Sequence, residues 1–120
     1  MVKHGHAVCY RWDELESDQP MALLSRKRVI GEKAMISRVV LKKGCVVPRH
    51  AHENEQFACI MSGALEFTIG DESQPRVVTA RAGAVMYLPS DVPHAAEALE
   101  DTVVLDIFSP PSEKTGIDRR

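Results

Sequence analysis

Two histidines spaced two residues apart, His50 and His52, are the residues in this sequence whose types and spacing best suit chemistry. They lie in a segment with valines and a proline, and on a β-strand this spacing points both imidazoles to the same face. Gln56 follows four residues later, where an apolar run begins, and a bend would return its amide to the same place. Two imidazoles and one oxygen donor make half of a transition-metal site.

The other half of such a site must come from elsewhere in the chain, and His94 is the candidate. It follows residues 83–93, a segment typical of a strand and then a turn. Three nitrogens and one oxygen leave one or two positions open, which suits Ni, Zn, Mn, Fe or Co. The plainer alternative is that these histidines are ordinary surface residues of a β protein.

The neutral side chain of Gln56 decides which chemistry such a metal would favour. With three imidazoles and an amide as ligands, a divalent ion keeps its full charge and acts as a strong Lewis acid toward an anionic or carbonyl substrate. The same ligands compensate a high-valent metal poorly, which disfavours chemistry with O₂. The alternative is that Gln56 marks a site that has lost its metal.

An acidic residue, Asp106, interrupts the last apolar run of the chain, residues 102–108. Strand alternation puts Val104, Asp106 and Phe108 on one face, which is either the interior or the solvent side. A buried carboxylate needs a partner or a nearby cation, and a metal site would supply one. Asp106 is therefore a candidate acid/base, with the outward orientation as the alternative.

Short strands at regular spacing must position these residues. No segment of a dozen residues shows a sustained helical period, whereas apolar runs end repeatedly at Gly, Pro, Ser and Asp. Many short strands with turns every 8–12 residues or so predict an all-β sandwich or barrel. We expect strands at residues 26–30, 34–41, 46–53, 55–61, 64–69, 76–80, 84–88, 94–98 and 102–108.

The two histidine-containing segments resemble the two sequence motifs of the cupin superfamily. The resemblance covers residues 35–110 and implies a single-domain cupin jelly-roll (double-stranded β-helix) barrel. In the second motif, Asp91 and Ala98 replace the usual glycine and asparagine. The matching positions are Gly44, His50, His52 and Gly63 in the first motif, with Gln56 in place of its glutamate, and Gly83, Pro89 and His94 in the second.

Within the superfamily, the sequence is most similar to small pectin-degradation cupins that act on unsaturated uronates. Those proteins carry a Glu-Gln pair after the histidines, as Glu55 and Gln56 do here, and a Leu-Asp-x-Phe-x-Pro stretch, matched by residues 105–110. The family's arginine just after this stretch is Ser112 here, which weakens the case for a sugar acid. The resemblance implies one divalent metal held by His50, His52, Gln56 and His94, Asp106 as catalytic acid/base, and Phe108 as a substrate-binding residue.

The reaction implied by this resemblance is ring opening and tautomerisation of a 4,5-unsaturated uronate. Two other functions stay open. A cupin dioxygenase would depend on Fe(II) and take up O₂. A metabolite-binding cupin without turnover would bind its ligand equally well after Asp106→Asn.

Composition narrows the class of protein. The chain of 120 residues is 27% charged and 44% hydrophobic, which fits one soluble domain. A net charge of −2 gives no reason to expect nucleic acid or an anionic membrane as partner. No apolar run suits a membrane span, and the N-terminus lacks a signal-peptide pattern, so we expect a cytoplasmic protein. The three cysteines lack a Cys-x-x-Cys spacing and predict free thiols.

We divide the chain into an N-terminal arm at residues 1–24, the cupin barrel at 25–111 and a loosely ordered tail at 112–120. A short chain with exposed strands invites pairing, so we expect a homodimer in which the arm reaches the partner. The expected ligand is a small molecule. The basic run of residues 26–28 predicts a solvated strand edge, in preference to an anion site.

Overall fold

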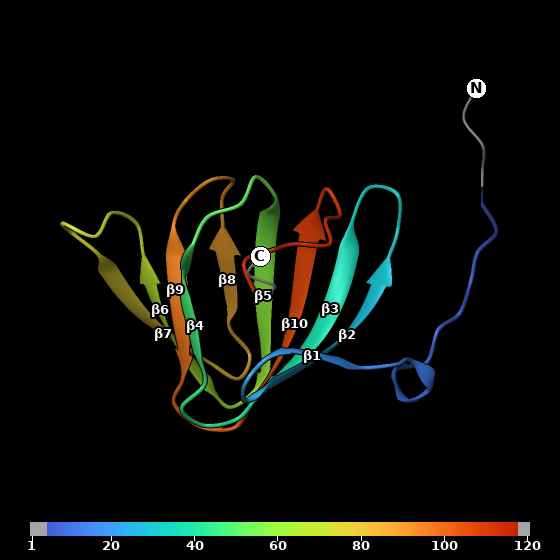
Figure 1. The fold of residues 1–120 in the computed structure, drawn as a ribbon, viewed down its shortest axis with the longest axis horizontal. Helices are drawn as coiled ribbons and strands as arrows, with labels where there is room; N and C mark the ends of the chain where they lie inside the picture. The colour runs from blue at the N-terminus through green and yellow to red at the C-terminus, as the bar shows by residue number, and fades with distance from the viewer. Residues whose placement is uncertain (1–4, 118–120) are drawn as a thin grey trace.

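Two antiparallel β-sheets face each other across an apolar interior in the computed structural model, which describes residues 5–117 (Figure 1). Within these residues, the only helical segment is a 3-10 turn, η1 (Trp12–Glu14). No helix in the described part of the chain is long and apolar enough to cross a membrane. The predicted all-β fold is confirmed.

The strands form one sheet of six and one sheet of four, and the expected barrel is not closed by hydrogen bonds between the sheets of the described chain. Neighbours such as the third and tenth strands are far apart in sequence, as in a jelly roll. The larger sheet has the order β1 (Asp18–Met21), β2 (Leu24–Ile30), β3 (Met35–Leu41), β10 (Thr102–Ser109), β5 (Glu55–Ser62), β8 (Val85–Leu88). The smaller has the order β4 (Val46–His50), β9 (His94–Ala98), β6 (Ala64–Ile69), β7 (Arg76–Arg81).

Strand alternation builds the core between the sheets. Along β3, buried and partly buried residues alternate without exception, and β10 follows the same rule with Val104, Asp106 and Phe108 inward. Directly paired residues on antiparallel strands share a face, so Val39 of β3 and Val104 of β10 pack side by side. Burial of such side chains contributes roughly 1.5–3 kcal/mol each.

The strand positions agree with the sequence-based expectation except at two places. The strand expected at 46–53 ends at His50, so His52 lies in the loop beyond β4. Strand β1 was not predicted, because its sequence is largely polar. It lies at the edge of the sheet, where backbone pairing with β2 is enough to form a strand without an apolar pattern.

Strand β1 also changes the interpretation of the basic run. Arg26 lies on the inner face of β2, opposite the buried Val39, and is only 3% exposed; its guanidinium makes two hydrogen bonds to the Asp18 carboxylate of β1, at 3.1 and 2.7 Å. The prediction of a solvated edge is therefore wrong for Arg26. The reason is that Arg26 pairs with Asp18 of β1, and this pairing cannot be predicted from the local sequence around residue 26.

The two ends of the described chain lie differently relative to the two sheets. The first described residues project away from the sheets (Figure 1), whereas the Trp12 carbonyl accepts a hydrogen bond from Lys27 of β2 and Asp18 pairs with the same strand. Beyond β10 the chain turns back across the interior (Figure 1), and Thr115 and Ile117 are buried. These two residues belong to the expected tail at 112–120, of which residues 118–120 lie outside the described chain.

Candidate metal centre

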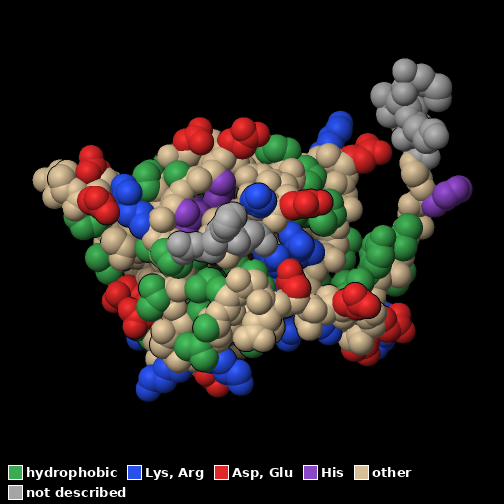
Figure 2. All heavy atoms as spheres, in the orientation of Figure 1, with side chains coloured by type: hydrophobic (Ala, Val, Ile, Leu, Met, Phe, Trp, Pro, Cys, Tyr) green, Lys and Arg blue, Asp and Glu red, His purple; other side chains and the backbone are tan. Residues whose placement is uncertain are grey.

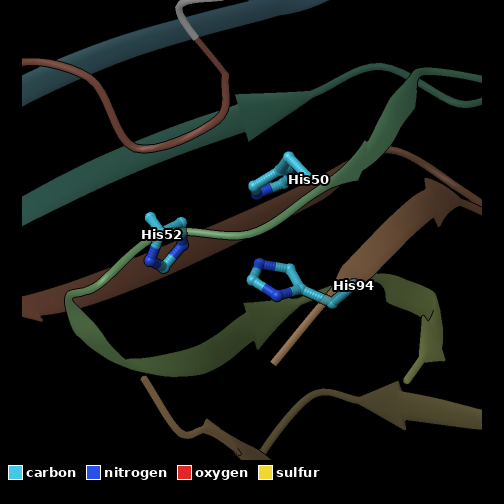
Figure 3. A group of neighbouring side chains, drawn as sticks. All are labelled: His50, His52 and His94. Carbon is cyan, nitrogen blue, oxygen red and sulfur yellow. The ribbon is translucent and has the colours of Figure 1, made fainter. Parts of the chain in front are cut away.

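Three histidines from two strands and a loop converge at one end of the interior (Figure 3). His50 is the last residue of β4 and pairs with His94, the first residue of β9. The ring centroids of these two lie 4.3 Å apart, and those of His52 lie 5.5 Å from His50 and 5.1 Å from His94. One nitrogen of each ring lies within 4.8 Å of the others. The structure thus brings together the three histidines singled out from the sequence.

A backbone carbonyl orients each of the three rings. In each case the Nδ1 atom lies within hydrogen-bonding distance of a carbonyl oxygen, which can only accept, so a neutral ring bonded in this way carries its proton on Nδ1 and a lone pair on Nε2. Metal-binding histidines are oriented in this manner in proteins. The contacts are His50 with Pro48 at 2.7 Å, His52 with Asn54 at 3.1 Å and His94 with Val92 at 3.0 Å.

The Nε2 atom of His94 supports a metal most directly. It is buried and has no hydrogen-bond partner within the described chain, an arrangement that is uncommon and unfavourable in folded proteins. Burial lowers the pKa of His94 to about 4, so the ring is neutral near pH 7 and its lone pair is available. A metal bound at Nε2 would satisfy this atom.

Gln56, on β5, connects the histidines to Asp106. Its Nε2 donates to the Asp106 carboxylate at 3.0 Å, which turns its Oε1 toward Nε2 of His52 at 3.2 Å. Both ring nitrogens of His52 face an oxygen that can only accept, the Asn54 carbonyl and Oε1 of Gln56. Because a neutral imidazole has only one N–H, one ring nitrogen must face its oxygen with a lone pair. A cation at Nε2 of His52 would remove this conflict. The donor set therefore fits a divalent metal held by three imidazoles and the Gln56 oxygen.

Asp106 and Phe108 lie on the inner face of β10, so the outward alternative for Asp106 is excluded. Asp106 is 6% exposed, and its burial raises the pKa of the carboxyl to about 7, although the hydrogen bond from Gln56 opposes the rise. The Phe108 ring lies edge-on to the His52 ring, with centroids 5.8 Å apart. A glutamate at position 56 would place a second carboxylate against Asp106, which gives a physical reason for Gln at this position.

The C-terminal segment lines part of the cavity beside these residues. The cavity has a volume of about 40 Å³, and Thr115 and Ile117 form part of its lining together with Asp106 and Phe108. Gly116 has a φ of +95°, and a Cβ added to it would overlap the His50 imidazole. Sequence reasoning did not identify these contacts; a glycine followed by an isoleucine in a polar tail was the available signal.

Comparison with known proteins gives the family. A model of the cupin domain matches residues 37–108. KdgF from Halomonas sp. has 26% sequence identity and a TM-score of 0.78, with 90% of this chain and 97% of that chain covered. An RmlC-like cupin from Shewanella frigidimarina NCIMB 400 has 21% identity and a TM-score of 0.79, with 87% and 91% covered.

A variant of oxalate decarboxylase from Bacillus subtilis shares the same fold, with 22% identity, a TM-score of 0.76 and 88% of this chain covered. The present chain spans only 30% of that protein. A search of the curated proteins gave no match. Since the cupin model covers more than half of the chain, the protein belongs to the cupin family.

Proposed function

We propose that this cupin is a metal-dependent enzyme that acts on a sugar acid, opening and tautomerising the ring of an unsaturated uronate. One observation carries the proposal: the Gln56 side chain contacts both a histidine of the candidate metal site and the Asp106 carboxylate. A Lewis-acid site and an acid/base therefore share one cavity. The sequence resemblance to pectin-degradation cupins and the likeness to KdgF support the choice of substrate.

The histidines, Gln56, Asp106 and Phe108 would each have a part in this reaction. The three histidines and Oε1 of Gln56 would hold one divalent metal, which supplies a Lewis acid that polarises a substrate oxygen. Asp106 would move a proton between oxygen and carbon, because its carboxylate lies inside the cavity beside the metal ligands. Phe108 forms an apolar wall and limits the access of water. A uronate is larger than the present cavity, and the C-terminal segment that contributes Thr115 and Ile117 to its lining would move aside to admit it.

The test combines metal analysis with a turnover assay. We expect the purified protein to contain one divalent metal per chain and to consume a 4,5-unsaturated uronate. Asp106→Asn should keep its metal content and lose about 10²–10⁴-fold in turnover, the usual contribution of a general acid/base. Oxygen uptake with Fe(II) would instead indicate a dioxygenase, and tight ligand binding without turnover would indicate a binding protein.

We also propose that two copies pair through the outer face of the six-stranded sheet. Ile107, Phe57 and Tyr87 lie in one cross-strand row there, and all three are exposed. The rings of Phe57 and Tyr87 are 5.0 Å apart, and Met61 and Val85 extend the apolar surface. A contiguous apolar patch on a sheet face is typical of an interface.

The exposed area of the whole chain supports this pairing. The chain exposes 7458 Å², whereas a folded monomer of this mass is expected to expose about 6,500 Å². Part of the excess comes from the projecting segment, in which Val8 and Tyr10 are exposed. These side chains would be covered if the segment lay on a second copy, as the expected arm does.

A further inference from the structure

The inner face of β2 carries arginines at positions where the neighbouring strands carry apolar residues. Leu24, Arg26 and Arg28 alternate along this face, and Arg28 pairs with Ser37 of β3. Ser37 in turn pairs with Asp106 of β10. Because directly paired residues share a face, Arg28 lies in the same cross-strand row as Asp106. Two strand spacings separate their backbones by about 10 Å.

A second arginine, Arg26, and the Asp18 carboxylate lie near Arg28. Arg26 holds the Asp18 carboxylate with two hydrogen bonds, and the nearer oxygen, Oδ2, lies 3.9 Å from the Arg28 guanidinium. Figure 2 shows both basic and acidic side chains on the same face of the molecule as the histidines.

The second contact of Arg28 is long. Its guanidinium donates to the carbonyl of Glu113 at 3.4 Å, which is beyond the usual length of an N–H to oxygen hydrogen bond. The Arg28 side chain is 23% exposed. Glu113 belongs to the C-terminal segment that contributes Thr115 and Ile117 to the cavity, so its oxygen would be withdrawn from Arg28 if that segment moved aside.

We propose that Arg28 binds the carboxylate of the substrate and makes the site select acidic over neutral sugars, an inference that rests on the proposed function. The carboxylate would replace the Glu113 carbonyl as acceptor. A guanidinium binds a carboxylate through two parallel hydrogen bonds, which one backbone carbonyl cannot accept. An arginine side chain and one sugar ring together span the distance from β2 to Asp106. Arg28 would thus hold the carboxylate beside β2 and leave the reacting carbon beside Asp106.

The competing explanation is that Arg28 only fastens the C-terminal segment. In that case its removal would change the binding of neutral and acidic sugars alike, because both need the same opening. If Arg28 binds the carboxylate, only the acidic sugar is affected. A matched pair of ligands therefore distinguishes the two roles.

The experiment measures binding of D-galacturonate and D-galactose to the metal-loaded full chain by calorimetry. The variants are Arg28→Gln, Arg28→Lys and, as control, Arg38→Gln, which removes an arginine from the outer face of the adjacent strand β3. Thermal unfolding checks that all variants fold. We expect galacturonate affinity to fall at least about tenfold in Arg28→Gln, which corresponds to about 1.4 kcal/mol. Arg28→Lys should fall less, because it keeps the charge without the paired donors.

The control variant and the galactose affinity should stay at wild-type values. Equal galacturonate affinity in wild type and Arg28→Gln would overturn the inference, as would an equal loss for galactose. A wild-type protein that does not prefer galacturonate would also overturn it. The turnover assay with Asp106→Asn decides the proposed function separately, because galacturonate lacks the unsaturated bond and reports binding alone.

Discussion

Gln56 is the residue at which metal binding and proton transfer depend on each other. Its amide presents oxygen to His52 and donates its N–H to Asp106, and no charged side chain of similar shape can do both. A glutamate would improve the charge balance of a metal but repel the Asp106 carboxylate. The departure from the cupin motif therefore follows from the presence of an acid inside the same cavity.

Gln56→Glu should separate these two requirements. In the metal-free protein at pH 8, the exchanged side chain loses a buried hydrogen bond and faces a carboxylate, which should lower the free energy of unfolding by about 2–4 kcal/mol. Urea unfolding with a chelator measures this difference. Gln74→Glu makes the same chemical change on an exposed loop and should have little effect. Equal stabilities of the two variants would contradict the role of the amide.

Asp106 should reduce the stability of the metal-free protein at neutral and alkaline pH. The ordinary pKa of the carboxyl, 3.8, is raised by burial to about 7 in the fold, so the folded state holds a proton that the unfolded chain releases. The resulting stabilisation is complete below about pH 4 and is lost as the pH rises to about 7. In urea titrations at pH 8, the free energy of unfolding of Asp106→Asn should therefore be higher than that of wild type by up to about 4 kcal/mol.

The same comparison near pH 4 should show similar stabilities, since the carboxyl is then protonated in both states and Asn preserves its shape. A difference between wild type and Asp106→Asn that does not change with pH would show that the carboxyl is not buried as described.

At the scale of elements, the strands that could be predicted are those whose own sequence carries the pattern of a strand. Strands such as β3 and β10 were predicted because alternate residues face the core, and their apolar side chains repeat with the period of a strand. Strand β1 and the C-terminal segment were not, since both have polar sequences and become enclosed only through partners distant in the chain. The burial of Arg26 was missed for the same reason, because its partner Asp18 belongs to β1.

The candidate site, too, was predicted only in part from the sequence. The spacing of His50 and His52 suggested a metal site, although His52 lies beyond the strand that the spacing argument assumed. Strand alternation limited Asp106 to two orientations, and the cupin resemblance favoured the inward one. The bond from Gln56 to Asp106 was not expected, because local sequence does not encode the register between β5 and β10.

The C-terminal segment should detach when Gly116 is replaced. Gly116→Ala combines a left-handed backbone with an overlap between the new Cβ and His50, so Thr115 and Ile117 should leave the cavity. Limited trypsin digestion, read by mass spectrometry, should then cut after Lys114 faster than in wild type. Gly83→Ala is the control: its φ is also +95°, but nothing lies within 4 Å of the added Cβ. Equal cleavage at Lys114 in the two variants would argue against the contact.

At the scale of the whole molecule, the apolar outer face of the six-stranded sheet should determine the oligomeric state. Light scattering at micromolar concentration should give a dimer for wild type and a monomer for Phe57→Glu, because a charge in the centre of an apolar interface is unfavourable. Val77→Glu, on the smaller sheet, places the same charge on an exposed residue outside this face and should remain dimeric. A monomeric wild type would contradict the pairing.

The packing of Gly116 against His50 also makes the state of the site visible in a magnetic resonance spectrum. A backbone this close to an imidazole lies within the field of its ring current, so the α-protons of Gly116 should resonate away from those of the other glycines. A paramagnetic ion at His50 would broaden these signals, whereas zinc would only shift them. A residue without a side chain thereby reports which metal the protein holds and whether its C-terminal segment is in place.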